Sequence, residues 1–170
     1  MMIAIRAEKA GDAKAIFQVI TTAFGRDAEA DLVDALRRRR QLTVSLVAER
    51  GGQVVGHVAF SPVIVTSPAE TWEAVGLGPV AVEPSAQRQG IGTALVREGL
   101  RQCRRRNENV VFVLGHPGFY GPFGFVPSKP HGITWERSVP ESLFQVAELR
   151  KNALAGRGGV VRYQPEFDTV

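Results

Sequence analysis

The turn from Gln87 to Gly92 carries the strongest chemical signal in this sequence. The segment Gln87-Arg88-Gln89-Gly90-Ile91-Gly92 follows a mostly apolar run that ends at Pro84, and it leads into a helical pattern. Backbone N–H groups at a helix N-terminus lack intrahelical partners and carry partial positive charge. Glycines there remove the side chains that keep a phosphate at a distance, and Arg88 adds a cation. The turn therefore predicts an anion site, although two glycines also occur in strand-to-helix turns that bind nothing.

Other chemistries lack their sequence patterns. The turn has neither Gly-x-Gly-x-x-Gly nor Gly-Lys-Ser/Thr, the patterns of dinucleotide and nucleoside triphosphate sites. No Gly-x-Ser-x-Gly segment indicates a serine hydrolase. One cysteine and three well-separated histidines give neither an internal disulfide nor metal-ligand spacing, so we expect no metal site.

The elements that position the turn alternate between strand and helix patterns. We predict strands at residues 3–6, 42–48, 53–60, 63–65, 72–82, 110–114, 133–136 and 160–163. We predict helices from Asp12, from about Ala28, from Gly90 to about Arg105, and from Pro140 to Leu149. The fold class is therefore α/β, with a mixed sheet that is antiparallel at the front and has 110–114 parallel to 72–82.

Length and composition fit one globular domain spanning residues 1–170. Hydrophobic residues make up 44% and charged residues 22% of the chain, which argues against disorder. The N-terminus lacks the apolar core of a signal peptide, and no apolar run is long enough for a membrane span, so we expect a cytoplasmic protein and no membrane partner. The net charge of +4 favours anionic ligands.

At the turn the chain resembles the GNAT superfamily of N-acetyltransferases. Gln87 to Gly92 matches the family signature Gln/Arg-x-x-Gly-x-Gly/Ala, and Val80-Ala81-Val82-Glu83-Pro84 is similar to the strand before it. The resemblance covers about residues 3–127, whereas 128–170 is a variable part of the same domain. His116-Pro117 and Tyr120-x-x-Phe123-Gly124-Phe125 look closest to a bacterial branch of predicted acetyltransferases.

The resemblance implies acetyl-CoA as co-substrate and a GNAT-like, mostly antiparallel sheet with a splayed parallel strand pair. In the family the pantetheine arm inserts where the strands part, and Gly76, Gly78 and Pro79 suit such a break. The backbone of Val80 and Val82 then pairs with pantetheine amides. The expected cofactor-binding residues are Val80, Ala81, Val82, Gln87, Arg88, Gln89, Gly90, Ile91, Gly92 and Thr93.

Acetyl transfer needs an acid for the leaving thiolate and a neutral amine. Tyr120 lies where the family places a tyrosine near the cofactor sulfur, and a phenol stays protonated at neutral pH. Its alternative role is aromatic packing. Glu73, where relatives carry a carboxylate, and His116, whose imidazole titrates near neutrality, are the candidate bases. His57 and a relay through water remain alternative candidates for the base.

The predicted function is transfer of acetyl from acetyl-CoA to a primary amine by direct attack. The acceptor, a small molecule or a peptide, is not identified by any motif. The alternative is a regulatory module that binds acyl-CoA without turnover. The arginine clusters at 37–40 and 101–106 raise nucleic-acid binding as a third hypothesis, ranked last because the aromatic residues lie elsewhere. Dimers are common in the family, which leaves a homodimer open.

Overall fold

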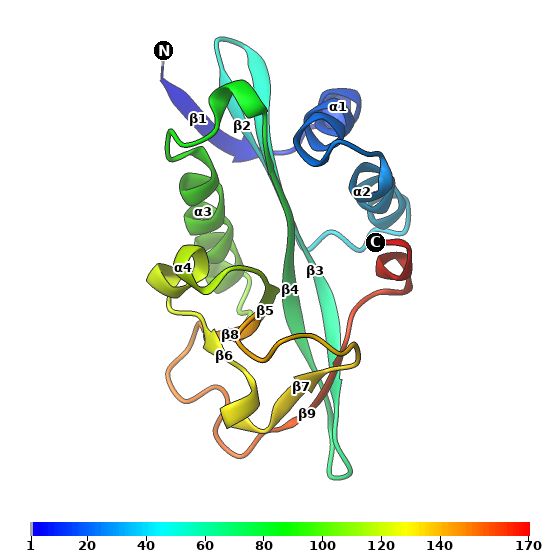
Figure 1. Ribbon diagram of the computed structural model, residues 1–170, viewed down its shortest axis with the longest axis vertical. Helices are drawn as coiled ribbons and strands as arrows, with labels where there is room; N and C mark the ends of the chain where they lie inside the picture. The colour runs from blue at the N-terminus through cyan, green and yellow to red at the C-terminus, as the bar shows by residue number, and fades with distance from the viewer. Residues whose placement is uncertain (1) are drawn as a thin grey trace.

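A long antiparallel hairpin forms the centre of the sheet in the computed structural model, which describes residues 2–170 (Figure 1). Its two strands are β3 (Gln53–Thr66) and β4 (Thr71–Val82). The strand order is β1-β2-β3-β4-β5-β8-β6, and β9 pairs with both β3 and β7. The other strands are β1 (Ile3–Ala7), β2 (Val44–Arg50), β5 (Val110–Leu114), β6 (Val126–Pro127), β7 (Ile133–Trp135), β8 (Phe144–Glu148) and β9 (Gly159–Arg162).

The predicted mixed sheet is confirmed, including the parallel pair of β4 and β5. That pair is short, because Val75–Leu77 face Val111–Val113 and the strands then part. At the same point the register against β3 shifts, so that Gly78 and Pro79 together face Ala59. This extra residue is a bulge that turns β4 away from β5. A second parallel pair, β7 with β9, was not predicted.

The helices cover both faces of the sheet (Figure 1). The longer ones are α1 (Ala13–Phe24), α2 (Ala28–Arg38) and α3 (Ile91–Arg105), and α4 (Pro117–Tyr120) is a single turn. Short 3-10 turns occur at η1 (Ala10–Asp12), η2 (Pro84–Ala86), η3 (Gly121–Phe123), η4 (Lys129–His131) and η5 (Pro165–Thr169). Helices α1 and α2 lie on the side opposite α3, and η5 lies beside α2.

Close packing of α3 fixes where its N-terminus sits. Leu95, Leu100 and Cys103 are buried in the core between α3 and the sheet. Gly99 also faces this core, and a Cβ there would overlap the ring of Phe60 on β3. The missing side chain lets the helix approach the sheet, and this places the first turn of α3 beside the end of β4.

The predicted helix from Pro140 to Leu149 is wrong. Residues 144–148 form β8, which pairs with β5 from Val110 to Leu114 and with β6 at Val126 and Pro127. The first four residues of β8 are all buried. Because these residues are buried on both faces of the strand, they show no alternation, and a short apolar run of this kind is indistinguishable from a buried helix by pattern alone.

Candidate active site

A groove lies beside the turn that the sequence singled out. Its volume is about 450 Å³, and we call it the turn groove. Helix α3 begins after Gly90, whose φ of 83° is left-handed, and Arg88 has a φ of 61°. Ala94 donates to the Gly90 carbonyl, so the N–H groups before it in the first turn have no helical partner. The groove therefore offers a row of backbone donors to an anion. Its lining residues are Val80, Val82, Ala86, Gln87, Arg88, Gly90, Ile91, Gly92, Thr93, Phe119 and Tyr120.

Two of the predicted cofactor residues do not line this groove. Ala81 is buried on the opposite face of β4, in the cluster that contains Ile16 and Ile20 of α1, because side chains alternate along a strand. Gln89 turns away, since its amide donates to the Ser85 carbonyl at 3.4 Å and its oxygen accepts from Arg50 at 3.0 Å.

The backbone of β4 presents a free edge to the groove. Glu83 N–H donates to the Val55 carbonyl at 2.8 Å, so in this antiparallel ladder the alternate residues Ala81 and Glu83 direct their backbone groups toward β3. Val80 and Val82 direct theirs toward the other edge, where β5 has already separated. The Gln87 amide reaches the Val82 carbonyl at 3.0 Å from that side. An extended chain with amides finds hydrogen-bonding partners along this edge.

Tyr120 stands where the turn groove meets a second cavity. It packs edge-on against Phe119 at 4.8 Å and Phe125 at 5.7 Å between ring centroids. Its ring lies over Gly115, where a Cβ would overlap it. Gln145 of β8 donates to the Gly115 carbonyl at 3.0 Å and so fixes the loop that leaves β5. Burial raises the pKa of the Tyr120 phenol to about 12, which keeps it protonated.

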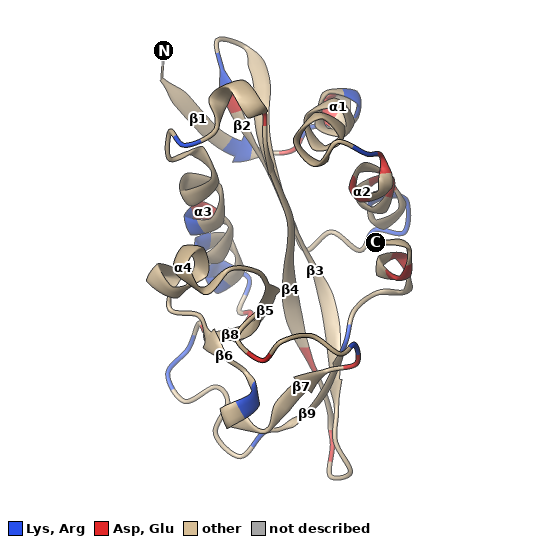
Figure 2. Cartoon of the chain, in the orientation of Figure 1, with Lys and Arg blue, Asp and Glu red and all other residues tan. Residues whose placement is uncertain are grey.

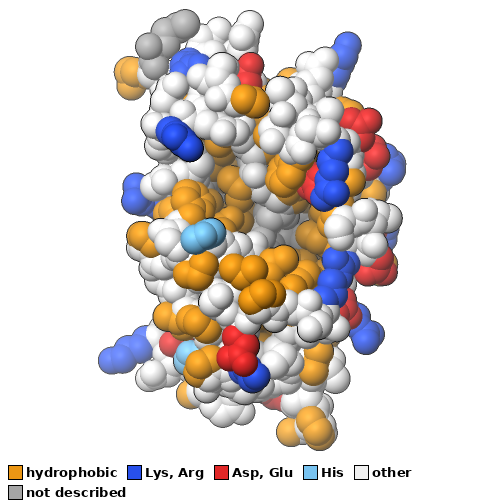
Figure 3. Space-filling view, viewed as in Figure 1, with side chains coloured by type: hydrophobic (Ala, Val, Ile, Leu, Met, Phe, Trp, Pro, Cys, Tyr) orange, Lys and Arg blue, Asp and Glu red, His pale blue; other side chains and the backbone are white. Residues whose placement is uncertain are grey.

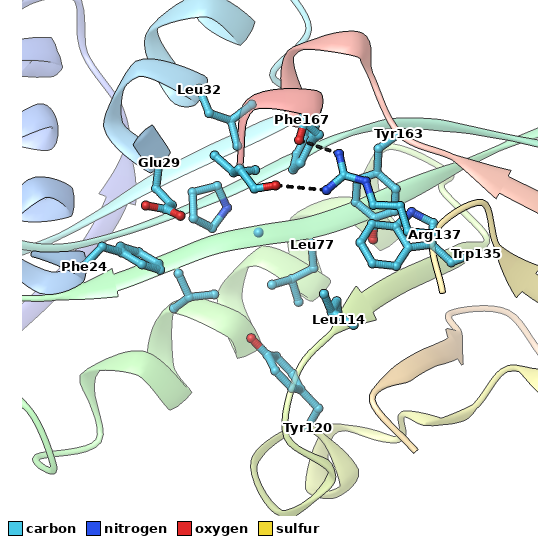
Figure 4. A pocket seen from close by; sticks show the side chains of 14 residues that line it. Phe24, Glu29, Leu32, Leu77, Leu114, Tyr120, Trp135, Arg137, Tyr163 and Phe167 are labelled. Carbon is cyan, nitrogen blue, oxygen red and sulfur yellow. Dashed lines mark hydrogen bonds between the residues drawn. The ribbon is translucent and has the colours of Figure 1, made fainter. Parts of the chain in front are cut away.

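The second cavity, of about 400 Å³, lies between the sheet, α2 and the segment after β9 (Figure 4). We call it the aromatic cavity. It shares Val80 and Tyr120 with the turn groove. Figure 3 shows hydrophobic side chains around a hollow on this face of the molecule. Its lining residues are Phe24, Glu29, Leu32, Leu77, Gly78, Pro79, Val80, Leu114, Tyr120, Trp135, Arg137, Tyr163, Phe167 and Val170.

Few polar side chains face the aromatic cavity, and they lie toward two ends (Figure 4). Glu29 is at one end, where its carboxylate accepts hydrogen bonds from Arg26, which lower its pKa. Arg137 is at the other, donating to the carbonyls of Phe167 at 2.5 Å and Val170 at 3.0 Å. Those bonds hold η5 against the cavity as one of its walls.

Tyr163 comes from the variable C-terminal part of the domain. It lies in the wall of the aromatic cavity, only 8% exposed, with a hydroxyl that has no hydrogen-bond partner among residues 2–170. Gly76 makes room for it, since a Cβ there would lie 2.6 Å from the ring. Burial, with the nearby Tyr120 phenol, raises the pKa of Tyr163.

The candidate bases lie outside both cavities. Glu73 is exposed near the start of β4, four residues or about 13 Å of strand before Leu77. His116 is exposed at the N-cap of α4. His57 is fully buried in the core, where its Nε2 lies 2.8 Å from the Ser45 hydroxyl. Among the described residues, Glu29 is the one acidic side chain that lines the aromatic cavity, and no spacing in the sequence indicated it.

Charged residues are spread over several helices, strands and loops (Figure 2), and some of them are paired within the fold. Arg37 binds Glu8 and Asp34, and Arg101 binds Glu98. Across the described part of the chain, no three His, Cys, Asp or Glu side chains are placed to hold a metal ion. Within residues 2–170 no helix combines the length and apolar character that crossing a membrane requires.

Comparisons with known proteins agree with this geometry. Residues 4–127 match the family model of the acetyltransferase (GNAT) domain. A protein named uncharacterized N-acetyltransferase YhbS, from Escherichia coli K12, is 40% identical over 165 residues, covering 96% of this chain and 98% of the relative.

Two solved structures are similar over nearly the whole chain. The crystal structure of YhbS from Escherichia coli in complex with CoA has a TM-score of 0.92 at 40% identity and covers 98% of this chain and 92% of that one. A GNAT family acetyltransferase from Brucella melitensis in complex with acetyl-CoA has a TM-score of 0.80 at 38% identity, covering 98% and 99%. With the splayed strands and the glycine turn in the same chain, these matches show that the protein belongs to the GNAT superfamily of N-acetyltransferases.

Proposed function

We propose that this protein transfers the acetyl group of acetyl-CoA to a primary amine, with Tyr120 as the acid. The observation that carries the proposal is the meeting of two cavities at Val80 and Tyr120. The turn groove suits the donor, because it combines helix N–H groups for the pyrophosphate with a free strand edge for the pantetheine arm. The CoA and acetyl-CoA complexes of the two similar structures support this assignment.

In the proposed reaction the amine nitrogen attacks the thioester carbonyl carbon at the junction of the cavities. The C–N bond forms, the C–S bond breaks, and the thiolate takes its proton from the Tyr120 hydroxyl. The proton of the amine leaves to solvent, because neither Glu73 nor His116 lines the aromatic cavity. The Tyr120 phenolate regains its proton from solvent, which restores the acid for the next turnover. Glu29 is a weak base there, since Arg26 lowers its pKa, but its charge suits contact with an ammonium group.

Gly92 gives a direct test of the donor assignment. It lines the turn groove, and a Cβ there would meet only Phe119 and Val82 at 3.7 and 3.8 Å, which are ordinary contacts. Gly92→Asp places a negative charge beside the proposed pyrophosphate, whereas Gly92→Asn has nearly the same shape without the charge. We expect the Asp variant to bind acetyl-CoA at least 10-fold more weakly than the Asn variant by titration calorimetry. Equal affinities of the two variants for acetyl-CoA would show that the pyrophosphate does not bind at this turn.

A regulatory module that binds acyl-CoA without turnover is the second candidate. It is favoured by the absence of the two predicted bases from the aromatic cavity. Release of free thiol from acetyl-CoA in the presence of an amine library distinguishes the two. Turnover that disappears in Tyr120→Phe excludes the module, and acetyl-CoA binding without turnover by any amine favours it.

A cytoplasmic location and a homodimer, the latter common in the family, are part of the proposal. Cell fractionation tests the location. Size-exclusion chromatography with light scattering tests the dimer, for which an 18.5 kDa species would be the contrary result.

A further inference from the structure

We propose that the acceptor is a small monoamine whose amino group is attached to an apolar body the size of an aromatic ring. This inference rests on the proposed transfer to an amine and names the class of that amine. It comes from the side chains that line the aromatic cavity.

The walls of the cavity are mainly aromatic and aliphatic. Phe24, Leu32 and Phe167 line it on the side of α1, α2 and η5. Leu77 and Leu114 line it on the side of the sheet. Its volume of about 400 Å³ falls within the range of small-molecule sites, about 300–1,000 Å³. Aromatic bodies bury a large apolar area against such walls, whereas polyhydroxylated or very short amines leave the walls uncovered.

The charges in the cavity disfavour a polyamine. Among the described residues that line the cavity, Glu29 is the one acidic side chain, and its carboxylate already accepts two hydrogen bonds from Arg26. Arg137 adds a guanidinium at the other end. A ligand with several ammonium groups would lose hydration at each one, gain at most one acidic side chain as a partner and face a like charge. The cavity therefore suits an acceptor with one amino group.

The wall beside Arg137 suits an oxygen on the far part of the acceptor. The Tyr163 hydroxyl and the Trp135 Nε1 are both buried there without a hydrogen-bond partner among the described residues. A buried donor without a partner costs free energy, so a ligand atom that accepts a hydrogen bond at this wall is favoured. Tyr163 is then a specificity-determining residue, which affects the KM for the acceptor more than kcat.

Four amines test the proposal in a thiol-release assay with the full chain and saturating acetyl-CoA. Tyramine has an aromatic body and an oxygen, phenethylamine lacks the oxygen, ethanolamine lacks the ring, and spermidine is a polycation. We expect kcat/KM to be at least 10-fold higher for tyramine than for ethanolamine or spermidine. A kcat/KM for either of these equal to that for tyramine would overturn the proposal. Tyr163→Phe should abolish any preference for tyramine over phenethylamine, and a preserved preference would remove Tyr163 from acceptor recognition.

Phe24 provides a variant that does not disturb the core, because its side chain is 41% exposed. We expect Phe24→Ala to lower kcat/KM for tyramine about 5-fold or more, through KM, with no change for acetyl-CoA. Val126→Ala is the matched control, since Val126 is 46% exposed and lines neither cavity. A loss of equal size with ethanolamine would contradict recognition of the ring.

The same panel separates failure of this inference from failure of the proposed function. If ethanolamine is the only amine that is acetylated, the proposed transferase function is supported and the proposal of an aromatic acceptor is overturned. If no amine releases thiol, calorimetry of N-acetyltyramine with the CoA-saturated protein decides the matter. If N-acetyltyramine binds and Phe24→Ala weakens that binding, the preference of the cavity for an aromatic ligand is supported although transfer has failed. If N-acetyltyramine does not bind, both the aromatic acceptor and the proposed transfer are overturned.

Discussion

Replacing Tyr120 by Phe removes one hydroxyl and leaves the surroundings of the ring intact. The ring is held by Phe119, Phe125 and the backbone of Gly115, and Phe makes the same contacts. The acetyl-CoA KM and the melting temperature should therefore change little. Loss of a positioned general acid lowers kcat by about 10²–10⁴-fold, which corresponds to about 3–5 kcal/mol of activation free energy.

The pH dependence sharpens the same prediction. An ordinary phenol is half ionised at pH 10, whereas a pKa of about 12 leaves Tyr120 about 1% ionised there. The kcat of the wild-type protein should rise as the amine loses its proton and should show no decline up to pH 10. Thiol release measured from pH 6 to 10 tests this, with Val126→Ala, which lines neither cavity, as the control that keeps kcat. A Tyr120→Phe variant within threefold of wild-type kcat, or an alkaline decline centred below pH 10, would refute the assignment.

Two further predictions concern groups that hold the site in place. Gly115→Ala introduces a Cβ that overlaps the Tyr120 ring. We expect kcat, measured by thiol release, to fall at least 10-fold, and stability, measured by thermal melting, to fall by about 1–3 kcal/mol. A kcat equal to that of the wild-type protein would contradict this prediction. Burial lowers the pKa of His57 to about 4, so the unfolded chain binds a proton more readily than the folded one between pH 6.5 and 4. Stability should therefore decrease as pH falls through that range, by about 2 kcal/mol at pH 5. Urea unfolding at pH 7 and at pH 5 measures this loss. If His57→Gln shows the same difference in stability between the two pH values, a group other than His57 causes it.

The geometry of the turn groove was predictable from sequence because it is local. A glycine turn, the strand before it and the break at Gly78 and Pro79 lie within one short segment, where spacing carries the geometry. Ala81 and Gln89, which were predicted as cofactor-binding residues, do not line the turn groove, because a signature names consecutive residues whereas alternation and the twist of a turn send some side chains elsewhere.

The aromatic cavity was not predictable in the same way. Apart from Tyr120, its polar residues come from α2, from β7 and the loop after it, and from the segment after β9, and each lies in a part of the sequence without a motif. Glu29 and Tyr163 line the same cavity because α2 packs beside η5 and Gly76 makes room for a ring. Pairing with β5 and β6 also determines that β8 is a strand, because its apolar run by itself is compatible with either helix or strand.

The two cavities share few residues, and this separation bears on how such proteins diversify. Substitutions at 135–137 or 163–170 reshape the aromatic cavity while leaving the turn after β4 untouched. Substitutions in the tail can therefore change which acceptor is bound, while every intermediate sequence still binds the donor. The bulge at Gly78 and Pro79 is the exception, because it both parts the strands and lines the aromatic cavity. Sequence drift should be tolerated in the tail and resisted at that bulge.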